Sequence, residues 1–103
     1  MRFRPTALGW IDLEVSTAPD WDSAQMHRLA RYLGYSLVWP EFSVIPLVDQ
    51  VRAADVDAVI VPSPEHLHPI MLNALMDVAD VETVLPRMSF ARWVLHHPAG
   101  SLG

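Results

Sequence analysis

Val56-Asp57-Ala58-Val59-Ile60-Val61-Pro62 is the segment around which the rest of this chain must pack. Three of its seven residues are valine, and prolines at positions 62 and 64 end it. A short apolar run that is rich in β-branched residues and bounded by such breakers is typical of a strand buried on both faces. Strands of this kind lie in the middle of parallel sheets that helices cover, so the segment predicts an α/β fold.

The elements on either side of this strand alternate between strand and helix. Apolar residues that alternate or run together favour strands over residues 8–15, 35–39, 56–62 and 81–86. Apolar residues at helical spacing favour helices over residues 21–33, over residues 46–54 and from Pro69 onward. Gly34 stands where a left-handed C-cap of the first helix belongs. This order predicts a parallel sheet with right-handed crossover connections.

The predicted fold is therefore a small three-layer α/β domain with a four-stranded, mostly parallel sheet. We expect residues 1–7 to form an N-terminal arm, residues 8–86 to form the domain and residues 87–103 to form a C-terminal tail. For the tail we expect one helical turn or an extended strap that packs Trp93 against the domain. Because the tail has little of its own to bury this indole, Trp93 is a candidate interaction residue.

Composition limits the class of protein. The chain has 103 residues, of which 51% are hydrophobic and 18% charged, so it predicts one small globular domain. The formal net charge is −5 and there is no lysine, which makes nucleic acid an unfavourable partner. The absence of cysteine excludes disulfides and cysteine-based zinc sites. The apolar runs are too short for a membrane span, so we expect a cytoplasmic protein.

Three segments in order, residues 9–16, 29–35 and 47–61, resemble the N-terminal catalytic domain of serine recombinases, the resolvase/invertase family. The resemblance covers roughly residues 8–86, and its third segment is the most specific: a helix, an Asp-Val-Asp turn and an apolar strand. It implies a resolvase-like fold. In that family a serine on the first strand attacks a DNA phosphate, and arginines hold the phosphate and stabilise the transition state.

The family's arginine positions are occupied by other residues in this chain. The strand motif of the family runs aromatic-x-Arg-x-Ser, and alignment on Gly9-Trp10 places Asp12 at the arginine and Glu14 at the serine. Alignment on Ser16 instead places Glu14 at the arginine. The second motif, Asp-Arg-Leu-x-Arg, matches residues 65–69, which contain no arginine. A carboxylate about 4 Å from a phosphate is repelled by a few kcal/mol at an intermediate dielectric, so the resemblance implies a domain without phosphoryl-transfer activity.

Polar side chains should nevertheless converge where the first and third strands end, because the loops after neighbouring parallel strands meet at one edge of a sheet. The candidate ligand-binding residues there are Asp12, Glu14, Ser16, Glu65, His66 and His68. The spacing of the two histidines places them on opposite sides of an extended loop. Carboxylates and imidazoles are ligands for metals or small polar molecules, but an abandoned active site whose polar groups face water gives the same pattern.

The sequence therefore leaves three hypotheses. The first is a catalytically inactive, resolvase-like domain that serves as a protein-interaction or dimerisation module, with no catalytic residue, no metal and no cofactor. The second is a DNA strand-cleaving recombinase domain in which Ser16 is the nucleophile. The third is a small metal- or ligand-binding domain that uses the acid and histidine cluster. The missing arginines favour the first.

Overall fold

A computed structural model of the chain describes residues 4–40 and 45–93. The predicted arm and tail thus extend, at residues 1–3 and 94–103, outside the described residues. The elements in chain order are β1 (Thr6–Gly9), α1 (Pro19–Leu33), β2 (Ser36–Val38), α2 (Leu47–Ala54), β3 (Ala58–Val61), the 3₁₀ turn η1 (Pro64–His66), α3 (Pro69–Leu75), β4 (Asp80–Thr83) and β5 (Met88–Phe90). No helix among the described residues is long and apolar enough to cross a membrane.

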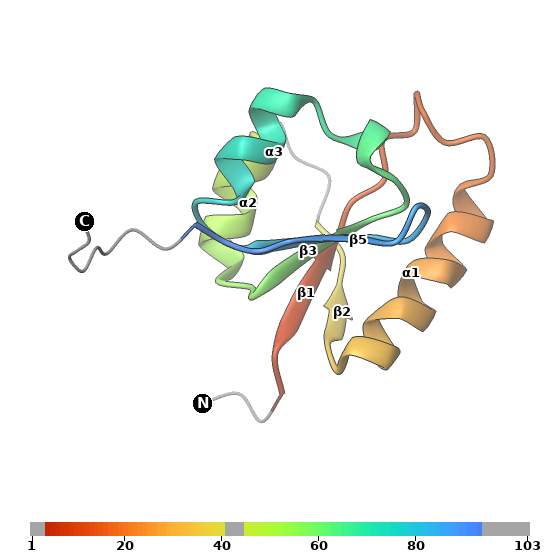
Figure 1. The fold of residues 1–103 in the computed structure, drawn as a ribbon, viewed down its shortest axis with the longest axis horizontal. Coiled ribbons are helices and arrows are strands. Elements are labelled where there is room, and N and C mark those ends of the chain that lie inside the picture. The colour runs from red at the N-terminus through yellow and green to blue at the C-terminus, as the bar shows by residue number, and fades with distance from the viewer. Residues whose placement is uncertain (1–3, 41–44, 94–103) are drawn as a thin grey trace.

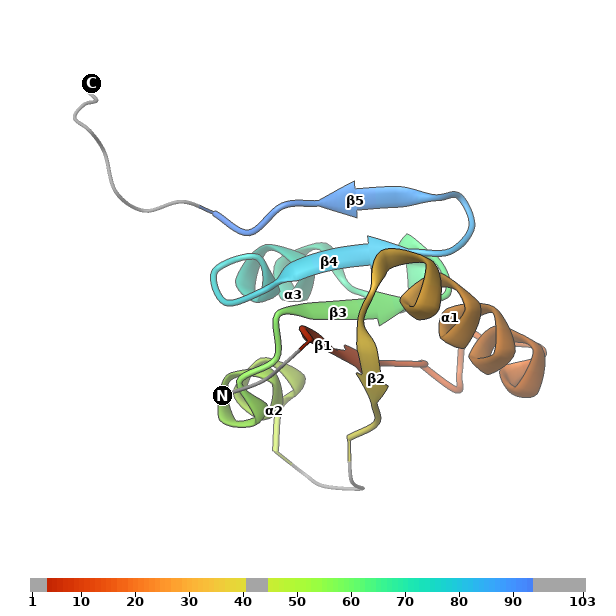
Figure 2. The same ribbon diagram turned by 90° about the horizontal axis from the view of Figure 1, so that it is seen from below.

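The strands form one mixed sheet in the order β2-β1-β3-β4-β5, in which the first four are parallel and β5 is antiparallel to β4. Helix α1 covers one face of the sheet, and α2 and α3 cover the other, as Figures 1 and 2 show. The α/β class and the mostly parallel sheet are confirmed. The prediction of four strands was wrong, because β5 adds a fifth.

Strand β3 lies at the centre of this arrangement and its four residues are completely buried. Ala58 and Ile60 pack with Met26 of α1 in one core. Val59 and Val61 belong to the second core, beneath α2 and α3. Burying one such side chain contributes about 1.5–3 kcal/mol. Strand β3 lies between the two cores and contributes buried side chains to both. The strand buried on both faces is thereby confirmed.

Strand β1 differs from its prediction at both ends. It begins at Thr6 rather than at residue 8, and it ends at Gly9. The carbonyl oxygen of Asp12 accepts hydrogen bonds from the backbone N–H groups of Val15 and Ser16, at 2.9 and 3.0 Å. Residues after Gly9 therefore fold into a turn instead of extending the sheet, and the predicted alternation of buried and exposed positions up to residue 15 was wrong.

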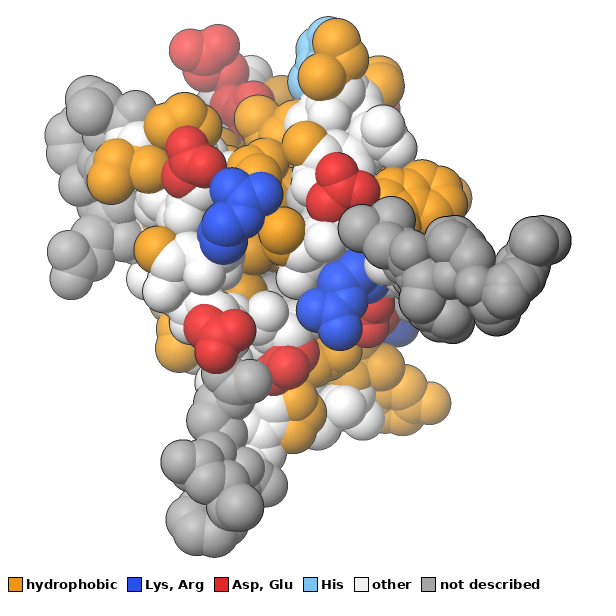
Figure 3. Space-filling model, turned by 90° about the vertical axis from the view of Figure 1, so that its left-hand side faces the viewer, with side chains coloured by type: hydrophobic (Ala, Val, Ile, Leu, Met, Phe, Trp, Pro, Cys, Tyr) orange, Lys and Arg blue, Asp and Glu red, His pale blue; other side chains and the backbone are white. Residues whose placement is uncertain are grey.

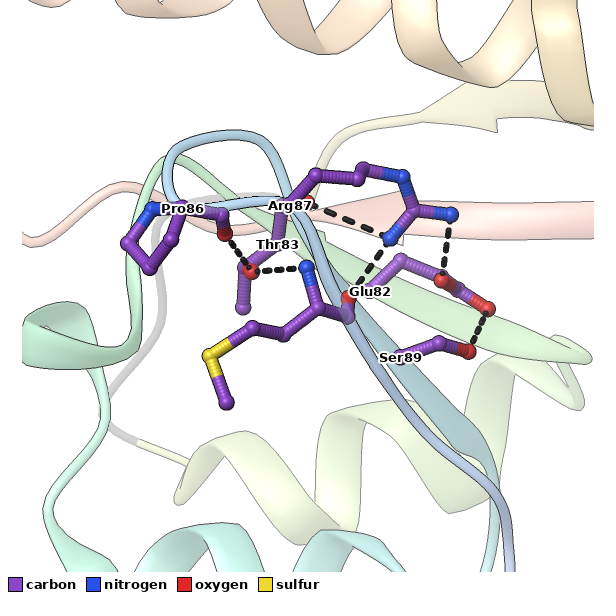
Figure 4. A network of polar contacts seen from close by, with 6 residues as sticks. Glu82, Thr83, Pro86, Arg87 and Ser89 are labelled. Carbon is purple, nitrogen blue, oxygen red and sulfur yellow. Dashed lines mark hydrogen bonds and ion pairs between the residues drawn. The ribbon is translucent and has the colours of Figure 1, made fainter.

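The described part of the tail is extended and begins with strand β5, so the alternative of a helical turn was wrong for residues 87–93. The β4–β5 turn is closed by Thr83, whose hydroxyl donates to the carbonyl oxygen of Pro86 and accepts from the backbone N–H of Met88 (Figure 4). Beyond β5, the backbone N–H of Trp93 donates to the carbonyl oxygen of Met76 at 2.7 Å. The described part of the tail thus lies along β4 and the end of α3.

Candidate functional site at the carboxyl edge of the sheet

Neighbouring strands β1 and β3 lead to opposite faces of the sheet. The chain leaves β1 for α1 on one face, and it leaves β3 for η1 and α3 on the other. Open α/β sheets bind ligands at such a switch point, outside the carboxyl ends of the strands. Figure 1 shows the β1–α1 loop and η1 close together at this edge. The candidate residues of both loops are therefore in one region of the molecule.

His66 joins the two loops. Its Nδ1 accepts a hydrogen bond of 2.8 Å from the backbone N–H of Asp12, and its residue is only 5% exposed. An acceptor at Nδ1 requires the neutral imidazole that carries its proton on Nε2. Burial lowers the pKa of His66 below 6.5, although the nearby carboxylates of Asp22, Asp12 and Glu65 act in the opposite direction. His66 is thus a neutral side chain that fixes the β1–α1 loop.

Ser16 is engaged by the start of α1. Its hydroxyl donates to Oδ2 of Asp22 at 2.6 Å and accepts from the backbone N–H of Ala18 at 3.3 Å. The N-cap position of α1 is Ala18, which has no side chain to cap the helix. The Ser16 hydroxyl and the Asp22 carboxylate therefore connect the loop to the first turns of this helix.

The other candidate residues lie nearer to water. Oδ1 of Asp12 accepts from the backbone N–H of Glu14 at 3.0 Å, and the Glu14 side chain is exposed. Glu65 is exposed but close enough to influence His66. His68 is also exposed, and its Nδ1 accepts from the backbone N–H of Ile70 at 3.2 Å, which caps α3. The structure thus brings Asp12, Glu65 and His66 together and leaves Glu14 and His68 facing solvent.

The charge of this edge is mostly negative. Residues 10–22, 45–46, 62–71 and 84–86 form most of it and contain five carboxylates and no arginine. Arg87 follows in the β4–β5 turn at the same edge, where it is paired with Glu82. The five carboxylates are those of Asp12, Glu14, Asp20, Asp22 and Glu65. Within the described ranges, no three histidine or acidic side chains come together as a group that could hold a metal ion. The described part of this edge can therefore attract a cation.

Sequence reasoning missed the apolar part of this edge. Large hydrophobic side chains are exposed along it, and six of them lie within the four ranges named above: Leu13, Val15, Trp21, Ile45, Ile70 and Leu85. We call these six residues and the five carboxylates the carboxyl-edge surface. It contains a hollow of about 640 Å³ between the β1–α1 loop and α2, and a smaller one of about 290 Å³ between α1 and the ends of β3 and β4. Only their common position in loops after strands or at the starts of helices could have indicated these residues.

The surface over α2 and the surroundings of Trp93 are separate from the carboxyl-edge surface. Figure 3 shows the side of the molecule with α2, on which basic and acidic side chains are interspersed. There Nη1 of Arg52 lies 3.2 Å from Oδ1 of Asp49. Trp93, the candidate interaction residue of the tail, is 47% exposed and lies against the end of α3, at the opposite edge of the parallel strands. It is therefore not part of the carboxyl-edge surface.

Comparison of the chain with models of protein families, with curated proteins and with solved structures finds no match. The site must therefore be interpreted from its own geometry.

Proposed function

We propose that this chain is a catalytically inactive, resolvase-like domain that acts by binding another protein. The observation that carries the proposal is the composition of residues 10–22 and 62–71, which follow β1 and β3 and contain five carboxylates and no arginine. A DNA phosphate under nucleophilic attack carries extra negative charge in the transition state and needs cationic groups around it. A carboxylate at about 4 Å would instead repel it by roughly 4 kcal/mol at an effective dielectric of 20. Phosphoryl transfer on DNA is therefore disfavoured at this edge.

The contacts of Ser16 support the same conclusion. A serine nucleophile needs a base that takes its proton and a group that stabilises the charge formed on the substrate. Asp22 accepts the hydroxyl proton at 2.6 Å and could serve as a base. No arginine within the described residues 10–22 and 62–71 could supply the second requirement. The contact between Ser16 and Asp22 instead holds the β1–α1 loop against the start of α1.

The exposed hydrophobic side chains favour binding over simple solvation. Large apolar side chains scattered singly over a surface are ordinary, whereas several at one edge, rimmed by polar groups, mark an interaction site. Leu13, Ile70 and Leu85 are each more than 70% exposed and come from the β1–α1 loop, the first turn of α3 and the β4–β5 turn. Their position at one edge of the sheet is the feature that a partner protein would cover.

Two measurements test the proposal. Supercoiled plasmid is incubated with the chain and with Ser16→Ala, and nicked DNA and covalent protein–DNA adducts are quantified; we expect neither product from either protein. A photoreactive phenylalanine analogue is then placed at Leu13 or, as a control, at Arg52 in cells that express the chain naturally. We expect discrete protein adducts from position 13 only. Cleavage that depends on Ser16, or the same adducts from both positions, would overturn the proposal.

A further inference from the structure

The larger hollow of the carboxyl-edge surface has the size of a binding site. Its volume of about 640 Å³ lies within the range of about 300–1,000 Å³ that is usual for ligand pockets. Its apolar walls come from three segments of the chain: Trp10 and Leu13 from the β1–α1 loop, Ile45 and Leu47 from the entry and start of α2, and Met71 from α3. We call it the α2 hollow. Walls of this kind accept apolar side chains.

The polar groups of the α2 hollow are acidic. Asp12, Glu14 and Gln50 are its charged or amide-bearing lining residues. The amide of Gln50 donates to the carbonyl oxygen of Ile45 at 2.8 Å, so it holds the chain that enters α2. Oδ1 of Asp12 accepts a backbone hydrogen bond, and the carboxylate of Glu14 is exposed. The groups left for an incoming molecule are therefore two carboxylates beside an apolar wall.

From this combination we infer that the α2 hollow receives a basic, amphipathic segment of a partner protein, whose apolar side chains enter the hollow while its arginine or lysine side chains pair with Asp12 and Glu14. The inference rests on the proposed function and names the chemistry of its partner. Charge complementarity selects this occupant, because both charged side chains that line the hollow, Asp12 and Glu14, are acidic. An amphipathic helix that lays apolar anchors into a groove is a common mode of peptide recognition.

The same charges disfavour the other occupants. A second copy of this chain would bring an identical acidic surface against the first in a two-fold symmetric contact, and the like charges would repel. An anionic ligand or nucleic acid would meet the same repulsion. A metal ion has no group of three ligands among residues 4–40 and 45–93. Among these occupants, a cationic partner is the one that is attracted by both carboxylates of the hollow, those of Asp12 and Glu14.

The binding experiment uses a defined probe. A fluorescent helical peptide with leucines on one face and arginines on the other is titrated with the full chain, and binding is followed by fluorescence anisotropy. Two peptides serve as controls: one has glutamate at every arginine, and one has serine at every leucine. We expect binding of the first peptide only. Equal binding of the serine peptide would show that charge alone acts, and it would overturn the inference.

Matched variants test the contacts. Glu14→Gln removes one rim charge and should weaken binding about threefold, and Asp12→Asn with Glu14→Gln should weaken it about tenfold. Leu13→Ser removes an apolar anchor and should also cost about tenfold. Asp77→Asn removes the same charge from an exposed position outside the α2 hollow, and its affinity should not change. An equal loss for Glu14→Gln and Asp77→Asn would overturn the inference.

Indole resonances locate the peptide. Trp10 lines the α2 hollow and Trp21 lines the smaller hollow, whereas Trp93 lies at the opposite edge. In a ¹H–¹⁵N NMR titration with the leucine–arginine peptide, the Trp10 side-chain signal should shift while that of Trp93 stays in place. A shift of Trp21 without Trp10, or adducts from position 13 at twice the mass of the chain, would overturn this inference. A partner that is photocrosslinked at Leu13 but has no basic segment would overturn it too and would leave the proposed function standing.

Discussion

The backbone N–H of Asp12 donates a 2.8 Å hydrogen bond to Nδ1 of His66, and this contact joins the loops that follow two neighbouring strands. The bond exists only while the imidazole is neutral, because a protonated Nδ1 is a donor. Burial keeps the folded pKa of His66 below the ordinary value of 6.5. Between these two pKa values the unfolded chain binds more protons than the folded one, so stability must fall as the pH decreases through this interval.

The first prediction follows from that sign. His66→Asn retains an acceptor near the position of Nδ1 and removes the titrating group. We expect the free energy of unfolding of the original chain to decrease between pH 7 and pH 5, by about 1.4 kcal/mol for each unit of pKa depression, and the variant to lose less. Urea unfolding at a series of pH values measures this. Equal slopes for the original chain and for His66→Asn would refute the assignment.

A second prediction concerns the fit of Trp39 over the end of β1. A Cβ atom at Gly9 would lie only 2.6–2.9 Å from three atoms of the Trp39 ring, so Gly9→Ala must displace the indole. Overpacking of this kind costs about 1–3 kcal/mol. In the background of Trp39→Leu the same substitution should be close to neutral, because alanine suits a strand better than glycine. A double-mutant cycle by urea unfolding measures the coupling, and a cost independent of residue 39 would contradict the predicted clash.

A third prediction concerns the β4–β5 turn. Thr83 is fully buried, and its hydroxyl contacts the carbonyl oxygen of Pro86 and the backbone N–H of Met88. Thr83→Val preserves the shape and leaves both backbone groups without their partner, which should cost about 1–3 kcal/mol. Hydrogen exchange should also show faster exchange of the Met88 amide. Thr17→Val, at an exposed loop position, is the control, and an unchanged Met88 exchange rate would refute the role of the hydroxyl.

The parts of the fold that the sequence predicted are those with a local signal. The segment 56–62 contains β3, Gly34 adopts the expected left-handed C-cap with φ of 87°, and α3 begins at Pro69. Each depends on residue types whose preference is intrinsic, such as β-branching, the conformational freedom of glycine or the fixed dihedral of proline. The order of parallel strands then follows from the connections.

The parts that the sequence did not predict depend on contacts between distant residues. The alternation over residues 8–15 resembles a strand, but the turn at Asp12 is fixed by a hydrogen bond to His66, 54 positions away. Three-residue β5 is too short for a periodic signal, and it depends on pairing with β4. Of the candidate site, the polar residues were identified by resemblance. Trp21 and Leu85 were not, because an exposed apolar residue acquires meaning only from its neighbours in space.

The last prediction concerns the acid on the inner part of β4. The side chain of Glu82 is 8% exposed, Ser89 donates to its Oε2 at 2.9 Å, and Nη2 of Arg87 lies 2.9 Å from its Oε1 (Figure 4). No hydrogen bond reaches Oε1, so the charge of Arg87 compensates it. Arg87→Met leaves a buried carboxylate without its counter-charge and should cost about 3 kcal/mol; adding Glu82→Gln should recover part of the loss.

Arg52→Met breaks an ion pair whose side chains are 60% and 56% exposed and should cost less than about 0.5 kcal/mol. Thermal and urea unfolding of the four proteins measure these differences, and equal costs at positions 87 and 52 would show that burial of Glu82 does not set the strength of its ion pair.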